Sequence, residues 1–210
     1  LPELNIQLAF VKSDYQPDDK LFFTGIKGIS DRANIRKSTV EARIKKVASL
    51  VNDSKEQWIV WCGLNQEANQ IKKLIPDSVN VQGSDSSDKK LQELQDFQNG
   101  NIRVLITKPK IAGFGMNFQN AHNMAFVGLN DSWESYYQCI RRSYRFGQYK
   151  PVNVHIVLAD IEEAIYHNIM KKEKVAKEMT DSLIKNVAEY EKDSISDVAK
   201  EWDYKTNTVE

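Results

Sequence analysis

Two arginines three positions apart, Arg142 and Arg145, stand in the segment 138–148, close to where Gly147 interrupts it. The segment predicts a helix, on which residues i and i+3 share one face. Two guanidinium groups side by side present planar forks of N–H donors, which match the oxygens of a phosphate group. A solvated basic helix end would show the same pattern, because cations also suit the negative end of a helix dipole. The two residues alone leave both interpretations open.

A loop upstream of the arginines strengthens the phosphate interpretation. The apolar run 102–106 predicts a buried strand, and the loop 107–117 follows it. The loop carries two lysines and two glycines: Lys108, Lys110, Gly113 and Gly115. Glycines allow a close approach of the backbone to a ligand. In parallel sheets ligands gather at the carboxyl ends of the strands, so this loop is expected to bind a ligand. The alternative is that it is a structural turn.

The elements that position these residues alternate along the chain. Expected strands cover 4–11, 58–62, 79–81, 102–106, 124–127 and 152–158. Expected helices run from a cap at Ser38 or Thr39 to Val51, over 65–75, from Ser86 or Ser87 to Gly100, over 132–145, and from 161 to about 188. This alternation predicts an α/β fold in which helices cover both faces of a largely parallel sheet.

Composition narrows the classes of partner. The 210 residues carry no net charge, but residues 101–150 hold seven lysines and arginines against two acidic residues, a local net charge of +5. A polyanion would therefore meet one local face. No apolar run is long enough to span a bilayer, and no signal peptide is evident. Cys62 and Cys139 lack metal-ligand spacing, which favours free thiols in a reducing cytoplasm.

Taken in order, these pieces resemble the second RecA-like lobe of a superfamily-two helicase, most of all the Swi/Snf-type branch and the helicase-like proteins of phages and prophages. Residues 58–64 resemble motif IV, 107–117 resemble motif V and 138–148 resemble motif VI. The resemblance implies a RecA-like three-layer αβα sandwich with a mostly parallel central sheet and a long C-terminal helix.

Two departures from the Swi/Snf pattern stand out. Motif VI there has Asp before its first arginine and His before its second, whereas this chain has Arg141 and Tyr144. The hydroxyl residues at the start of motif V are replaced, and Thr107 is a substitute candidate for them. These departures weigh against chromatin remodelling more than against membership of the ATPase family.

The resemblance also assigns roles to residues. It implies that Arg142 and Arg145 are catalytic arginine fingers of an ATPase. It places Gln138, Gly113 and Gly115 at the ATP, and it gives backbone contacts with nucleic acid to Thr107, Lys108, Lys110 and Asn117. ATP and Mg would be held mainly by an N-terminal lobe with a phosphate loop, a motif that these 210 residues lack.

The function expected from the resemblance is the second motor lobe of an ATP-dependent DNA translocase or helicase, inactive as an ATPase without its N-terminal lobe. Its expected partners are that lobe and DNA, duplex more than single-stranded, in a bacterial or phage-infected cytoplasm and without a membrane. The alternative is a non-catalytic nucleic-acid-binding or regulatory helicase-like module.

The expected organisation is a first strand and connector over 1–37 that lead in from the N-terminal lobe, a helicase lobe over 38–160, a helical extension over 161–190 and a polar tail over 191–210. The first residue is Leu rather than Met, which predicts a fragment of a longer protein.

Overall fold

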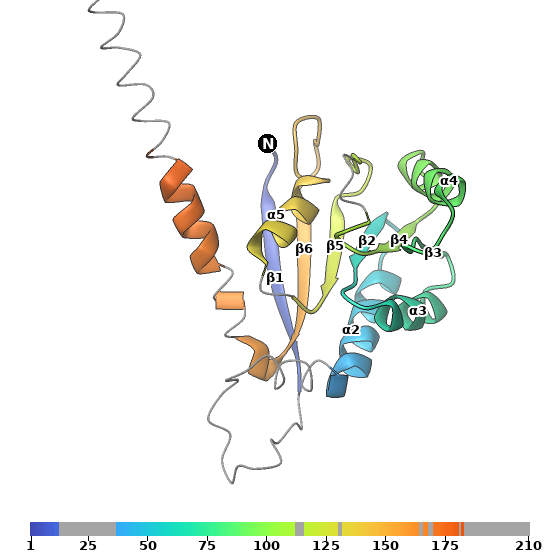
Figure 1. Ribbon diagram of the computed structural model, residues 1–210, viewed down its shortest axis with the longest axis horizontal. Helices are drawn as coiled ribbons and strands as arrows, with labels where there is room; N and C mark the ends of the chain where they lie inside the picture. Colours follow the sequence, from blue (N-terminus) through green and yellow to red (C-terminus); the bar gives the residue numbers. More distant parts are fainter. Residues whose placement is uncertain are drawn as a thin grey trace, which may run out of the picture. The chain divides into compact units, whose positions relative to one another are not determined.

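The computed structural model describes residues 1–12, 37–111, 116–129, 132–163, 166–167, 170–180 and 182. The chain forms two compact units, Leu1–Asn168 and Ile169–Glu210. The first unit contains every labelled element of Figure 1. Gly113 and Gly115, both expected at the nucleotide, lie outside the described residues.

A six-stranded sheet in the order β1-β6-β5-β2-β4-β3 forms the centre of the first unit (Figure 1). The strands are β1 (Leu4–Val11), β2 (Trp58–Trp61), β3 (Ser78–Asn80), β4 (Val104–Thr107), β5 (Asn123–Val127) and β6 (Val152–Ala159). All pairings between these strands are parallel. The prediction of an α/β fold with a largely parallel sheet is confirmed, and the opening strand is the edge of this same sheet.

Helices α2 (Val40–Asn52) and α3 (Asn65–Leu74) cover one face of the sheet. Apolar residues of α2 recur every three or four positions, so one stripe of the helix faces the sheet. Ile44 and Val47 of that stripe join a buried cluster with Trp58 and Val60, which point to the same face of β2. Strand side chains alternate between the two faces of a sheet. Every second strand residue therefore packs against α2 and α3, and the residues between them pack against the opposite layer.

The opposite face is packed by α5 (Trp133–Arg141). Trp61 of β2 stacks on Phe126 of β5 at a centroid distance of 6.3 Å, and Phe126 meets Tyr136 of α5 at 5.2 Å. Helix α4 (Ser87–Gln98) adds Phe97, whose ring meets Phe118 edge-on. The sheet therefore lies between two helical layers, as the RecA-like fold requires.

The second half of the expected long C-terminal helix belongs to the second unit. The expected helix start at 161 is instead a short 3-10 turn, η1 (Asp160–Glu162). Residues 170–180 are helical, with Lys174 paired to Glu178 one turn on. Among the described residues, no helix has the length and apolar character that a membrane crossing needs.

Candidate functional site

Helix α5 ends earlier than the sequence predicts, and this changes how the two arginines are presented. The expected helix 132–145 is wrong at its carboxyl end, because α5 stops at Arg141 and Arg142 is its C-cap. Arg145 lies in the turn beyond, where its amide donates to the carbonyl of Ser143 at 3.1 Å. The arginines therefore do not share one helix face, although the structure still brings them together.

The helix ends here because the loop before β5 forms a hydrogen bond with a carbonyl at the end of α5. The amide of Phe118 donates to the carbonyl of Arg142 at 2.8 Å, so that carbonyl does not accept from a residue one turn further along. In return, Nη1 of Arg142 donates to the carbonyl of Met116 at 3.3 Å. The loop before β5 and the end of α5 are thus fastened to each other.

Gln148 fixes the turn that carries Arg145. Its side chain is buried, and Nε2 donates to the carbonyls of Gln119 at 3.0 Å and Ser143 at 3.4 Å. Its Oε1 accepts from the amides of Tyr149 and Lys150. One amide side chain therefore holds both sides of the turn, a structural role that the resemblance did not assign.

Gly147 completes the turn for two physical reasons. Its φ of +92° lies in the left-handed region, which costs an L-residue with a Cβ atom. A Cβ atom there would also lie 2.6 Å from Nε2 of Gln119, whose amide donates to the carbonyl of Phe146. The glycine is required by this backbone, whatever the turn binds.

The turn and the end of α5 line an open hollow of about 460 Å³. Its walls are Gln138, Arg141, Arg142, Arg145 and Phe146. Three guanidinium groups thus face one concave surface at the carboxyl end of a helix, where the dipole favours cations. The guanidinium of Arg145 makes no hydrogen bond or ion pair with the residues that the structure describes, which leaves its donors available to an anion.

The other residues around this hollow are held more locally. Gln138 is exposed and donates to Glu134 one turn earlier at 3.1 Å. Arg141 lies over the ring of Tyr137 at 6.0 Å, and Tyr137 stacks on Trp133. Burial raises the pKa of the Cys139 thiol despite the opposing charge of Arg142, so Cys139 stays protonated and is no nucleophile.

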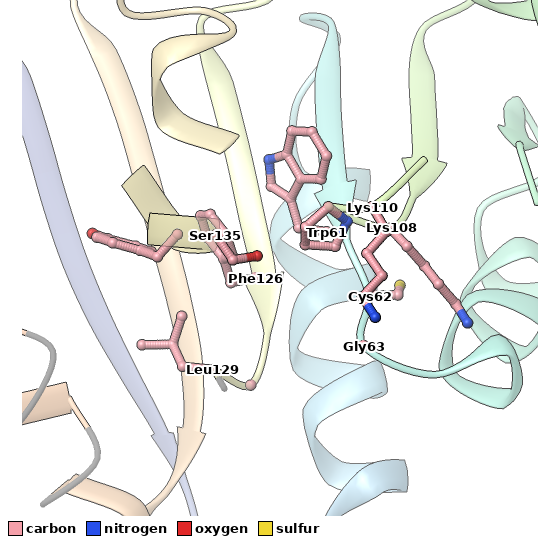
Figure 2. Close-up of a pocket in the computed structure, with 11 residues that line it drawn as sticks. Trp61, Cys62, Gly63, Lys108, Lys110, Phe126, Leu129 and Ser135 are labelled. Atoms are coloured by element: carbon pink, nitrogen blue, oxygen red, sulfur yellow. The ribbon is translucent and has the colours of Figure 1, made fainter. Parts of the chain in front are cut away.

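A second cavity, of about 260 Å³, lies at the carboxyl ends of three neighbouring strands (Figure 2). The ends of β2, β4 and β5 contribute residues 61–63, 108–110 and 128–129, and the first turn of α5 contributes Ser135 and Tyr136. Figure 2 shows Lys108 and Lys110 on one side of Trp61 and Leu129 and Ser135 on the other. This is the edge of a parallel sheet at which ligands gather.

This second cavity, called the lysine cavity below because Lys108 and Lys110 line it, contains donors suited to an anion. Lys108 is half-buried and Lys110 is exposed, and neither ammonium group is paired within the part of the chain that the structure describes. Trp61 is 2% exposed, and its indole N–H has no acceptor there either. The two ammonium groups suit the oxygens of a phosphate.

Two residues expected at the nucleic acid, Thr107 and Asn117, line neither hollow. Thr107 is fully buried, and its hydroxyl donates to the carbonyl of Val81 at 3.3 Å. Asn117 lines neither hollow, and its amide donates to Gln119 in the loop that fastens the end of α5. Of the expected nucleic-acid residues, only the two lysines share a cavity.

The two hollows share no lining residue and face different ends of α5. The lysine cavity takes in the first turn of the helix, and the arginine hollow takes in its last turn and the C-cap. The nine residues of α5 have a length of about 13.5 Å at 1.5 Å per residue. The arginine turn leads directly into β6, so it lies beside the amino end of that strand and not at the carboxyl edge.

A buried ionic network supports the carboxyl edge. Arg43 of α2 is fully buried, with Nη2 3.5 Å from Oε1 of Glu67 and Nη1 3.3 Å from Oε2 of Glu162. Glu67 accepts from the amides of Gly63 and Leu64, which follow β2. The sequence contained a signal for this network, because Arg43 falls three residues after Val40 and four before Val47, on the apolar face of α2.

The donors of the arginine hollow are guanidinium forks on a concave surface, which suit the oxygens of a phosphate group such as those of ATP. When bound, ATP would supply a transferable phosphoryl group, and Arg142 and Arg145 would hold its oxygens. Among the described residues, no group of three or more histidine, cysteine or acidic side chains could hold a metal ion.

Comparisons with known proteins identify the family of this chain. The helicase conserved C-terminal domain model matches residues 42–147, half of the chain, from α2 to the arginine turn. The bifunctional helicase and thymine dioxygenase JBP2 of Leishmania infantum is 37% identical over 86 residues, and that of Leishmania braziliensis is 36% identical. These matches cover 39% of this chain and 8% of each relative.

The crystal structure of the C-terminal part of the Fun30 ATPase domain superposes with a TM-score of 0.53 at 22% identity. The match covers 63% of this chain and 45% of that one, and it bears on the fold. The chain belongs to the family of helicase conserved C-terminal domains.

Proposed function

We propose that this chain is the second motor lobe of an ATP-dependent DNA translocase or helicase of the Swi/Snf-type branch. The observation that carries the proposal is the open hollow in which Arg142 and Arg145 meet beside an exposed glutamine, Gln138. The hollow offers arginine donors to a phosphoryl group that would be brought by another lobe. Membership of the helicase family supports the use of ATP and a nucleic acid as the track.

In this proposal the arginines place positive charge against the oxygens of the γ-phosphoryl group. Arginine fingers increase turnover in GTPases by roughly 10³- to 10⁵-fold. The two fingers differ in how they are held. Arg142 is fixed by the carbonyl of Met116, and Arg145 is carried on the turn that Gln148 and Gly147 shape.

Lys108 and Lys110 are proposed to contact the phosphate backbone of DNA. Their cavity offers donors and apolar walls but no acidic side chain. Backbone contacts of this kind position a protein on nucleic acid without reading its sequence. Thr107 is left out of the proposed contacts because its hydroxyl is buried and already bonded.

A substitution at the finger tests the proposal in the protein that joins this lobe to a phosphate-loop lobe. Arg145→Ala should reduce DNA-stimulated ATP turnover by about 10³-fold or more, since a finger is lost. ATP binding by the two-lobe protein should stay largely intact, because the phosphate-loop lobe holds most of the nucleotide. Arg145→Lys should also fail, because lysine keeps the charge but lacks the fork. The 210-residue chain alone should show no ATPase activity.

Lys150→Ala is the matched control, because Lys150 is an exposed cation of the same region whose partner is Glu56. It should turn over ATP at the wild-type rate. Near-normal turnover by Arg145→Ala would remove Arg145 from the catalytic role. Robust ATP hydrolysis by the 210-residue chain would contradict the two-lobe site.

A further inference from the structure

Phe146 is the most exposed large apolar side chain of the described residues, at 93%, and it lines the arginine hollow. Single exposed aromatic residues are common on protein surfaces and need no function. The exposure of Phe146 therefore carries weight only together with its backbone and its neighbours.

The backbone beneath Phe146 is held firmly on both sides. Its carbonyl accepts from Nε2 of Gln119, and Gly147 follows with its left-handed φ. Gln148 then bonds to both sides of the turn. A side chain presented from a fixed backbone loses little conformational entropy when it binds a ligand, so the exposed ring is pre-organised for a partner.

The surroundings of the ring define that partner's chemistry. Arg142 and Arg145 line the same hollow as Phe146 and present donors to anionic oxygens. Phe146 presents an apolar π face, which prefers another planar ring. A purely apolar partner would desolvate the arginines without satisfying them, which costs free energy. Inorganic phosphate would leave the ring unused, whereas a nucleotide carries both a phosphate chain and a planar base.

We propose that Phe146 stacks on the base of the nucleotide whose phosphates the arginine hollow holds. The inference rests on the proposed function and adds a base-contacting residue to the two fingers. Because Phe146 offers one face of its ring to the base, loss of the stacking contact should reduce the affinity for the nucleotide about tenfold.

The test compares ATP with inorganic tripolyphosphate, which has the phosphates and lacks the base. The ¹⁵N-labelled 210-residue chain is titrated with each ligand to millimolar concentrations, and amide shifts give the affinities. Phe146→Ala should weaken ATP binding about tenfold and leave tripolyphosphate binding unchanged. Phe146→Trp should retain ATP binding. Arg145→Ala should weaken both ligands, because it removes a phosphate donor.

Tyr149→Ala is the matched control. Tyr149 is 92% exposed and belongs to the same turn, but it does not line the hollow. The control should bind both ligands as the wild type does. Equal loss of ATP affinity in Phe146→Ala and Tyr149→Ala would overturn the inference, as would unchanged ATP affinity in Phe146→Ala.

Two further outcomes separate this inference from the proposed function. If the wild-type chain binds neither ligand, the stacking inference falls, whereas the proposed function is still judged by the turnover of Arg145→Ala in the two-lobe protein. If both ligands bind but Phe146→Ala weakens only a single-stranded oligonucleotide, the ring contacts the nucleic acid. That result would overturn the stacking inference and leave the arginine site standing.

Discussion

Arg142 and Arg145 line one hollow, but different parts of the backbone hold them, so their side chains differ in mobility. Arg142 is the C-cap of α5, and its guanidinium is tied to the carbonyl of Met116. Arg145 stands on a turn without a described partner for its side chain, so its position depends on the turn. We expect Arg142 to be preset and Arg145 to adjust when a phosphate arrives.

The turn can be tested at Gly147 through the free energy of unfolding. Gly147→Ala combines a left-handed φ with a close approach to Gln119, whereas Gly100→Ala combines a φ of +82° with open space. A left-handed φ alone costs about 1–2 kcal/mol, so Gly100→Ala should lose about that much. Gly147→Ala should lose clearly more, because the bond from Gln119 to Phe146 must also break, at about 0.5–1.5 kcal/mol.

Urea unfolding of the 210-residue chain measures all three variants. Gly83→Ala is the neutral control, since it has no left-handed φ and nothing within 4 Å of the added Cβ. If Gly147→Ala and Gly100→Ala lose the same free energy, the contact with Gln119 contributes nothing.

The sequence correctly predicted that Arg142 and Arg145 lie close together, but it did not predict the backbone conformation that brings them together. The spacing of Arg142 and Arg145 indicated a shared helix face, and the pair does meet, but through a turn. The turn depends on hydrogen bonds from Phe118 and Gln148 to groups distant in the sequence. Local periodicity does not contain such contacts, so it extended the helix four residues too far.

Among the elements, helices and strands with strong apolar patterns were predicted well. All six expected strands appear within two residues of their expected bounds. The buried Arg43 network was not predicted. A charged residue on an apolar stripe has no visible partner in the sequence, because Glu67 and Glu162 lie on other elements.

Removal of Arg43 should destabilise the first unit more than any surface substitution on the same helix. Arg43→Met leaves Glu67 and Glu162 buried without their shared cation, and such losses cost about 3–5 kcal/mol. Lys45→Met on the same helix removes an exposed pair with Glu41 and should cost less than about 1 kcal/mol. Thermal or urea unfolding separates the two values. Equal stability of both variants would show that the network contributes little.

The chain as a whole carries no net charge, but residues 101–150 are basic and contain the lysines that are proposed to contact DNA. Association with duplex DNA should weaken as salt rises, with a slope of about −0.9 per phosphate contact in a plot of log affinity against log salt. Lys108→Ala and Lys110→Ala should each reduce that slope by about 1.

Fluorescence anisotropy of labelled duplex DNA between roughly 50 and 200 mM salt measures the slope. Lys90→Ala is the control, because Lys90 is on α4 and donates to the carbonyl of Gly83, away from the cavity. A slope that is the same in all three variants would show that the two lysines do not contact DNA.

The length of helix α5 limits which sequence changes such a lobe can accept during evolution. Its first turn borders the lysine cavity and its last turn borders the arginine hollow, so the separation of the two is set by the hydrogen-bonded backbone between them. One inserted residue would turn one end by about 100° relative to the other. An insertion or deletion within α5 should therefore disturb the alignment of its two ends, whereas changes in the length and charge of side chains at either end leave it intact.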